Sequence, residues 1–375
     1  MGAVIGTDLL ETYRGELIFA DRELGRADRL ADRYPKRKVK TLAINVKDRA
    51  ELVKVLKDSK ATVLINAVNY YFNLDVMSAC LEAGVNYLDL GGMFHTTKKQ
   101  LAFDKDFKEK GILAIPGMGS SPGITNVLTA GAASRLDKIN TIDISFADKD
   151  YTEYSTSLVL PYSILTLFEE FGDKPIIFKN GKYVETEPIS GYEEKEFPKP
   201  LGNANCFFTL HSEAATLPTS FPTTENCWFR GGFDVSLVNQ IKLLMNIGFN
   251  SSEVVKLPNG NLVSPRDLIV KMTEKFIPMS NTKINDIEFL RVQVTGTSKG
   301  KPKKITAYCQ SFTNEKWNIP AGSWNTGVAP SVVAQLMDKG EITKTGVIPP
   351  ELALNPAVLF KDLEKRAMKI WIENN

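Results

Sequence analysis

The sequence contains few of the residues that build metal sites or disulfide frameworks. Only two histidines, His95 and His211, occur among its 375 residues, and its four cysteines are widely separated with no C-x-x-C pair. This scarcity argues against a zinc site, a His-rich metal centre and a disulfide framework, so we predict no bound metal. A reducing cytoplasm is the compartment that fits this cysteine usage best.

Long apolar runs and an excess of charge of one sign are also missing. No stretch approaches the roughly 20 apolar residues that span a bilayer, and the first residues lack the features of a secretory signal. The formal net charge is only +2, with 24% charged and 43% hydrophobic residues. This balance is typical of a globular protein and gives no electrostatic basis for binding nucleic acid or a membrane.

The first third of the chain alternates short apolar runs with amphipathic segments. Helices are expected from residue 26 and at 48–56 and 75–83, and strands at 16–20, 40–44, 62–66, 85–89 and 112–115. Near-continuous apolar strands separated by helices form parallel sheets that are covered on both faces. The pattern therefore predicts an α/β domain of the Rossmann type, with a doubly wound parallel sheet, over residues 1–122.

Beyond residue 139 the apolar runs become longer and partly alternating, as at 141–146, 174–178 and 288–294. Asn180-Gly181 and Asn259-Gly260 are hairpin turn signals. These features predict a second, α+β domain with a mixed or antiparallel sheet over residues 123–322. Residues 323–375 are expected to form helices that return to the first domain, one of them over 329–337 and ended by Gly340.

The dinucleotide-binding fingerprint is present only in part. In this motif, G-x-G-x-x-G follows a first strand, and an acidic residue ends the second strand. Here Gly2 looks like the last glycine and Asp21 like the acidic residue, but the first strand and first two glycines are missing. Either the recorded start lies inside the reading frame or the protein lacks a phosphate loop. We favour the first alternative, because a sheet without its central strand leaves backbone groups unpaired.

Asp21 also indicates which cofactor is used. A carboxylate at this position accepts hydrogen bonds from both ribose hydroxyls and repels a 2′-phosphate, which favours NAD. The neighbouring Arg22 can pair with a 2′-phosphate or stack on adenine, so NADP stays possible.

Five longer motifs follow in order along the chain. They are Asn66-Ala-Val-Asn-Tyr-Tyr-Phe72, Val85-Asn-Tyr-Leu-Asp-Leu-Gly-Gly92, Pro116-Gly-Met-Gly-Ser-Ser-Pro-Gly-Ile-Thr-Asn126, Trp228-Phe-Arg-Gly-Gly232 and Ile342-Thr-Lys-Thr-Gly-Val-Ile-Pro-Pro350. The first three resemble the saccharopine dehydrogenase family, and the last two are similar to lysine 6-dehydrogenases in particular. Saccharopine reductases have Asp where Ser121 stands here, and this departure favours an amino acid simpler than saccharopine.

The resemblance implies an NAD(P)-dependent dehydrogenase that oxidises the amine of a small amino-acid substrate. A base takes the amine proton as hydride leaves the carbon, and the resulting imine is hydrolysed. Lysine is the first candidate substrate, saccharopine the second and a carboxylated polyamine the third, and a homodimer is expected. The alternative of another class is a ligand-binding relative that lacks the phosphate loop and does not turn over.

Candidate site residues in the first domain follow its strands. Asn66, Ala67 and Val68 end one strand and are expected beside the nicotinamide ribose, although Asn66 can equally cap a loop. Tyr70 matches a substrate-contacting tyrosine of the saccharopine reductases and would orient the amine, or else pack the helix start. Asp89 ends another strand, where it would hold the substrate ammonium or act as a base, or instead cap the next segment.

Candidate substrate residues also lie at the crossover and in the second domain. Ser120 and Ser121 read as a helix start whose free N–H groups would bind a substrate carboxylate, or as a cap without a ligand. His211 is the candidate base, because it titrates near neutrality and lies where the resemblance places the substrate, although lone histidines are more often structural. Arg230 would bind a carboxylate in bidentate fashion or form a structural ion pair.

Overall fold

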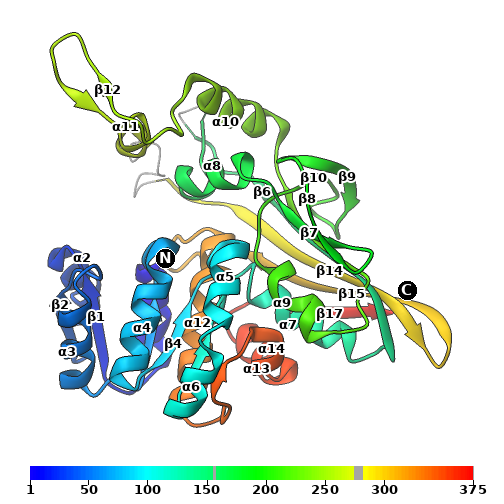
Figure 1. Cartoon of the computed structure of the whole chain (residues 1–375), viewed down its shortest axis with the longest axis horizontal. Coiled ribbons are helices and arrows are strands. Elements are labelled where there is room, and N and C mark those ends of the chain that lie inside the picture. The colour runs from blue at the N-terminus through cyan, green and yellow to red at the C-terminus, as the bar shows by residue number, and fades with distance from the viewer. Residues whose placement is uncertain (155–157, 274–281, 375) are drawn as a thin grey trace.

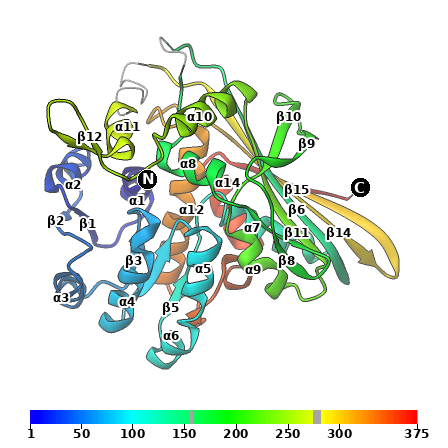
Figure 2. The same cartoon turned by 45° about the horizontal axis from the view of Figure 1, so that its top comes forward.

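The protein consists of two regions that pack side by side, one on short parallel strands and one on a large twisted sheet (Figures 1 and 2). The computed structural model describes residues 1–154, 158–273 and 282–374. Within these ranges no helix combines the length and apolar character that crossing a membrane requires.

The first region alternates helices and strands. Each predicted strand is found, with ends shifted by one residue at most. Local signals set the boundaries: Asp48 caps α3 by accepting a hydrogen bond from the N–H of Glu51, and Gly84 ends α4 with a φ of 77°. The elements are α1 (Gly2–Thr12), β1 (Leu17–Asp21), α2 (Leu24–Ala31), β2 (Val39–Ala43), α3 (Arg49–Ser59), β3 (Val63–Asn66), η1 (Tyr70–Phe72), α4 (Asn73–Ala83), β4 (Asn86–Asp89), α5 (Met93–Leu101), α6 (Asp104–Lys110) and β5 (Leu113–Ile115).

The parallel strands form two separate sheets. β1 pairs with β2, while β3, β4 and β5 pair in order and β16 (Gly346–Val347) joins beside β5. Among the described residues no ladder connects β1 to β3. In a doubly wound sheet the first strand lies between these two. In the part of the chain that the structure describes, no strand occupies this position between β1 and β3.

The second region contains a nine-stranded mixed sheet, as predicted. Its order is β17-β15-β14-β6-β11-β10-β9, with β7 paired to β11 and β8 paired to β7. Asn180 and Gly181 form the predicted β7–β8 turn with φ of 51° and 75°. The elements are α7 (Ile124–Ala133), β6 (Lys138–Asp150), α8 (Ile164–Gly172), β7 (Ile176–Lys179), β8 (Lys182–Glu185), β9 (Ser190–Glu196), β10 (Asn203–Phe208), α9 (Glu213–Ser220), β11 (Asn226–Gly232), α10 (Val235–Ile247), β12 (Val255–Lys256), β13 (Leu262–Val263), α11 (Pro265–Thr273), β14 (Asp286–Ser298) and β15 (Lys301–Phe312).

The C-terminal part contacts both regions. α12 (Ala321–Asp338) includes the predicted helix, and Gly340 follows it with a φ of 70°. α13 (Pro350–Ala353) and α14 (Pro356–Glu364) come next. The sequence predicts that the C-terminal part forms helices that return to the first region. Lys369–Asn374 instead form a strand, β17, which pairs with β15 of the second region. The alternation of Ile370 and Ile372 toward the core explains this strand.

One face of the large sheet supplies much of the core. Ile142 and Ile144 of β6 and Leu290 and Val292 of β14 are almost fully buried, and α7 and α12 pack against this part of the sheet. These side chains alternate along each strand, and burying each one contributes about 1.5–3 kcal/mol. α12 also contacts α1 and β3, so the hydrophobic core continues between the two regions.

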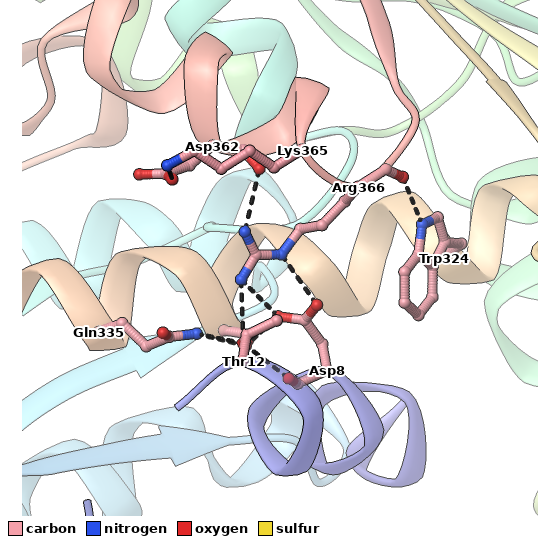
Figure 3. Close-up of polar contacts among 8 residues, drawn as sticks. Asp8, Thr12, Trp324, Gln335, Asp362, Lys365 and Arg366 are labelled. Carbon is pink, nitrogen blue, oxygen red and sulfur yellow. Dashed lines mark hydrogen bonds and ion pairs between the residues drawn. The ribbon is translucent and has the colours of Figure 1, made fainter. Parts of the chain in front are cut away.

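A buried ion pair fastens the C-terminal part to α1 (Figure 3). Nε and Nη2 of Arg366 donate to the two carboxylate oxygens of Asp8 at 2.8 and 3.0 Å. Asp8 also accepts a hydrogen bond from Ser331 of α12, and Arg366 Nη1 donates to the carbonyl of Asp362. The side chains are only 2% and 9% exposed, so the pair is nearly dry and fully hydrogen-bonded.

Candidate active site

Loops at the carboxyl ends of the parallel strands meet the second region, and the candidate active site lies at this junction. The loop after β5 reaches α9 through Ser121 and β14 through Ser120. η1, which follows β3, reaches α8 through Tyr71. Open parallel sheets bind their ligands at this edge.

His211 lies between β10 and α9 and stacks on Phe229 with a ring centroid distance of 3.8 Å. Its Nδ1 is 2.6 Å from Oε2 of Glu213, whose side chain is completely buried. Burial alone would lower the pKa of His211, but the negative charges of Glu213 and Glu170 raise it above its ordinary value. Burial likewise opposes the ionised form of Glu213, yet His211 holds the pKa of that carboxyl below its ordinary value.

Glu170 of α8 faces the other ring nitrogen of His211. Its Oε1 lies 3.9 Å from Nε2, beyond hydrogen-bond range, and its Oε2 accepts a hydrogen bond from the hydroxyl of Tyr162. Burial raises the pKa of Glu170 to about 7, although His211 opposes the shift. Burial and the charge of Glu170 also raise the pKa of Tyr162. Glu170 therefore titrates in the range that suits proton transfer at neutral pH.

Two further carboxylates face each other on neighbouring strands. Asp148 of β6 is directly opposite Glu288 of β14, and Glu288 accepts hydrogen bonds from Ser120 and Asn325 at 3.1 and 2.8 Å. Water reaches the side chain of Asp148. The charge of Glu288 opposite it raises the pKa of Asp148.

The pKa of Glu288 is raised as well. Burial raises its pKa to about 7 against the effect of its hydrogen bonds. Both carboxylates lie close enough to Tyr162 to raise its pKa, which links them to the group around His211. We use the name acidic cluster for the six residues His211, Glu213, Glu170, Tyr162, Asp148 and Glu288.

A polar contact joins the first region to α8 beside the acidic cluster. The hydroxyl of Tyr71 donates to Oε1 of Glu169, and Arg266 of α11 binds this oxygen and the tyrosine hydroxyl, each at 2.9 Å. Tyr70 is half-buried next to it, and burial, followed by the charge of Glu169, raises its pKa. Because Glu169 precedes Glu170 on α8, the contact holds Tyr70 and the acidic cluster near each other.

Asp89 and Asn66 belong to a closed network and do not face the acidic cluster. Asp89 is 1% exposed, and burial raises its pKa against several hydrogen bonds. The oxygen of Asn66 accepts a hydrogen bond from the N–H of Val68. Asp89 accepts five hydrogen bonds, from the N–H groups of Gly91 and Gly117 and from the side chains of Asn73, Tyr87 and Gln100. The geometry favours the alternative in which both residues cap loops.

The turn at Ser120 and Ser121 differs from its prediction. The N-cap of α7 is Gly123, whose φ of 125° and close approach to the backbone of Gly119 exclude a side chain. The N–H groups of residues 123, 124 and 125 are already bound to Asn126, Gly119 and Ser120. They are therefore not free for a substrate carboxylate, and the serine hydroxyls instead hold Glu288 and Glu213.

Arg230 points away from the acidic cluster, so the geometry does not support its predicted contact with substrate. Successive residues of a strand face opposite sides, and its neighbour Phe229 is the residue that stacks on His211. Arg230 instead donates to the carbonyl of Gly191 at 2.9 Å and pairs with Asp143 at 3.3 Å. These contacts favour the alternative prediction, a structural ion pair.

The predicted cofactor residues gather at one edge of the first region. α1 begins at Gly2 without a side-chain cap or an acidic residue in its first turn, and Gly2 lies against Ala67. Val68 is 45% exposed beside it. Asp21 ends β1, and the side chain of Arg22 is 78% exposed. An uncapped helix start suits a pyrophosphate and an acid after β1 suits a ribose, so these residues fit a dinucleotide.

Each of the two regions matches a family model, and both models describe domains of the same enzyme. The family described as saccharopine dehydrogenase NADP binding domain matches residues 2–115, and the saccharopine dehydrogenase C-terminal domain family matches residues 119–368. The chain belongs to the saccharopine dehydrogenase family. The resemblance found in the sequence is confirmed, and the protein is an NAD(P)-dependent dehydrogenase of the class that acts on carbon–nitrogen bonds.

Several characterised proteins are similar to this family member. Carboxyaminopropylagmatine dehydrogenase from a Synechocystis species is 25% identical over 342 residues, which cover 88% of this chain and 85% of the relative. Carboxynorspermidine synthase from Vibrio cholerae is 25% identical over 364 residues, covering 91% and 86%. The fold matches apo saccharopine dehydrogenase (L-Glu forming) from Saccharomyces cerevisiae with a TM-score of 0.76 at 13% identity, over 100% of this chain and 98% of the other.

Most residues of the acidic cluster are not indicated by any local sequence pattern. Glu213 is the exception, because it lies only two residues after His211, and an acidic residue so close in sequence is a candidate partner for a lone histidine. Glu170 sits in an amphipathic helix where a carboxylate is ordinary, and the pairing of Asp148 with Glu288 depends on the ladder between β6 and β14. No local pattern indicates that ladder.

Proposed function

We propose that this dehydrogenase acts at the C–N bond of an amino acid that carries a further positive charge, with carboxylated polyamines as the foremost substrate class. The acidic cluster carries the proposal. Glu170 lies 3.9 Å from His211, Asp148 and Glu288 approach Tyr162 beside Glu170, and Glu288 also binds Ser120 in the loop after β5. Carboxylates at close range favour a cation, and their interaction strengthens as water is excluded.

His211 is the proposed base. Its Nδ1 is bound to Glu213, so Nε2 is the nitrogen left to take a proton from the substrate amine. Tyr70 is proposed to orient the amine, because its raised pKa keeps the hydroxyl protonated near neutrality. Gly2, Ala67, Val68, Asp21 and Arg22 are proposed to hold NAD(P), with NAD preferred. NAD(P) bound there would supply the hydride acceptor for oxidation of the carbon that bears the amine.

The charge of the site orders the three candidate substrates. Lysine and carboxylated polyamines present cations, whereas saccharopine adds carboxylates that Asp148 and Glu288 would repel. The names of the two 25% identical relatives favour a carboxylated polyamine over lysine. The motif at 228–232, which resembles lysine 6-dehydrogenases, contributes Arg230 to the far face of the sheet and therefore does not report on the substrate.

A substrate panel tests the proposal. Carboxynorspermidine, carboxyaminopropylagmatine, lysine and saccharopine are assayed with NAD and NADP by the absorbance of the reduced cofactor. The highest kcat/KM is expected for a carboxylated polyamine, and a clear preference for saccharopine would contradict the role of the acidic cluster. Binding without turnover of any substrate, measured by calorimetry, would instead support the ligand-binding alternative. A homodimer and a cytoplasmic location stay predictions.

A further inference from the structure

Glu213 connects the proposed base to the loop that follows β5. One oxygen, Oε2, lies 2.6 Å from Nδ1 of His211. The other, Oε1, accepts hydrogen bonds from Ser121 at 2.5 Å and from Thr125 at 3.0 Å. The side chain is 0% exposed. Glu213 therefore cannot reach a substrate, and it acts only through the groups that it binds.

We propose that Glu213 is a positioning residue that fixes His211 in the tautomer with its proton on Nδ1. This inference rests on the proposed function, in which Nε2 of His211 takes the amine proton. An ionised carboxylate can only accept a hydrogen bond, so the ring nitrogen that faces it must carry the proton. Nε2 is then unprotonated, as a base requires.

The groups around His211 restrict the orientation of its imidazole ring. Phe229 of β11 lies against the ring at an interplanar angle of 15°, which limits rotation of the imidazole. Glu170 of α8 approaches Nε2 only to 3.9 Å, so it does not compete with Glu213 for the ring proton. Ser121 and Thr125 fix the other oxygen of Glu213. The position of the base is therefore tied to the loop at the carboxyl end of β5.

Histidine NMR tests this inference without relying on turnover. The chain has only two histidines, and the exposed His95 serves as an internal reference. In the unaltered protein the ¹⁵N spectrum of His211 is expected to show a protonated Nδ1 and a free Nε2 once the ring is neutral. Glu213→Gln should abolish this preference and lower the pKa of His211 by at least about one unit.

A matched variant separates Glu213 from general disturbance of the site. Thr125→Val removes one hydrogen bond to Oε1 of Glu213 without touching His211, so it should leave the tautomer unchanged. In activity assays Glu213→Gln is expected to lower kcat/KM about 10²-fold and to move the acidic limb of its pH profile downward.

The possible outcomes distinguish the two levels of the proposal. A proton on Nε2 in the unaltered protein, or an unchanged tautomer in Glu213→Gln, would overturn the positioning role. If the tautomer responds as expected but His211→Ala retains full activity, the positioning role stands and the proposed base is wrong. Should Glu213→Gln fail to fold, Glu213→Asp keeps the charge but withdraws it by one methylene, and an unchanged tautomer signal in that variant would also overturn the inference.

Discussion

Asp8–Arg366 and Glu213–His211 are both buried ion pairs, but their surroundings differ. Around Asp8 each oxygen accepts a hydrogen bond, and each nitrogen of the Arg366 guanidinium donates one. Around His211 only Nδ1 has a close partner, while Nε2 faces Glu170 at 3.9 Å. The first pair is complete, and the second leaves one nitrogen open.

The difference also appears in the neighbouring charges. The Asp8 pair balances one carboxylate against one guanidinium in the space between α1, α12 and the C-terminal part. The acidic cluster sets four carboxyl groups against a single imidazole. Burial raises the pKa values of Glu170 and Glu288 to about 7, and the charge of Glu288 raises the pKa of Asp148. A complete pair stabilises the fold, whereas an incomplete one keeps protons exchangeable near neutrality.

Removing Arg366 should produce the largest effect on stability. Arg366→Ala leaves Asp8 buried without its partner and is expected to lower the free energy of unfolding by about 3–5 kcal/mol. Lys365→Ala is the matched control, because its pair with Asp362 is exposed and worth about 0–1 kcal/mol. Denaturant titration of the three proteins decides the point. An equal decrease in the free energy of unfolding in both variants would show that the buried Asp8–Arg366 pair stabilises the protein no more than an exposed pair does.

Removing the proposed base should affect activity but not stability. His211→Asn, whose amide can still donate a hydrogen bond to the buried Glu213, is expected to lower kcat/KM about 10²-fold or more, equivalent to roughly 3 kcal/mol of transition-state stabilisation, with little change in Tm. His95→Ala, at an exposed position, is the control. A large fall in Tm with activity retained would place His211 among structural residues and remove the contrast with Asp8.

The ionised carboxylate of Glu170 should destabilise the folded protein, in contrast to the Asp8–Arg366 pair, which stabilises it. A carboxyl whose folded pKa is raised contributes stability below its unfolded pKa and loses this contribution as the pH rises through the folded value, here from about 4.5 to about 7. Glu170→Gln is therefore expected to stabilise the protein by roughly 2 kcal/mol at pH 8 and to change little at pH 4.

Glu193 provides the control of opposite sign for this experiment. Burial opposes its ionised form, but Lys195 holds the pKa of Glu193 below its ordinary value. Glu193→Gln should therefore not stabilise the protein at pH 8. Denaturant midpoints measured from pH 4 to pH 8 compare the two variants. A fall in the stability of Glu170→Gln at pH 8 would contradict the assignment.

Asp148 is expected to affect substrate binding more than chemistry. Asp148→Asn should raise KM for a carboxylated polyamine about tenfold at pH 8, corresponding to roughly 1.4 kcal/mol, with kcat largely retained. The effect should shrink at pH 6, because the charge of Glu288 raises the pKa of Asp148 and a larger share of this carboxyl is then protonated. Glu185→Gln, on the exposed strand β8, is the control. A KM that does not respond at either pH would exclude Asp148 from the site.

Asp21 should produce the smallest change. Asp21→Asn keeps the hydrogen bond from the N–H of Glu23 but removes the charge, so the preference for NAD over NADP should fall roughly fivefold, as for an exposed charge worth about 1 kcal/mol. Comparison of kcat/KM with both cofactors measures it. A preference for NADP in the unaltered enzyme would assign Arg22 to the 2′-phosphate instead.

Much of the fold was predictable because its signals are local. The apolar runs of β1 to β5, the cap of α3 by Asp48 and the turn at Asn180-Gly181 all depend on residues close in sequence. The same local logic failed at Ser120 and Ser121. Their cap-like pattern is overruled by the tight turn at Gly119–Gly123, in which the backbone itself occupies the N–H groups at the start of α7.

The sequence by itself determined the residue types that chemistry needs: two histidines, an acid at the end of β1 and polar residues after β3. Only the tertiary structure decided which charges share a site. A shift of one residue in β11 would have turned Arg230 rather than Phe229 toward His211, and the β6–β14 ladder alone brings Asp148 beside Glu288. The register of a strand, and therefore the face on which each side chain lies, depends on the packing of the whole sheet, because a shift of one residue moves every side chain of the strand to the opposite face. No short stretch of sequence contains that information.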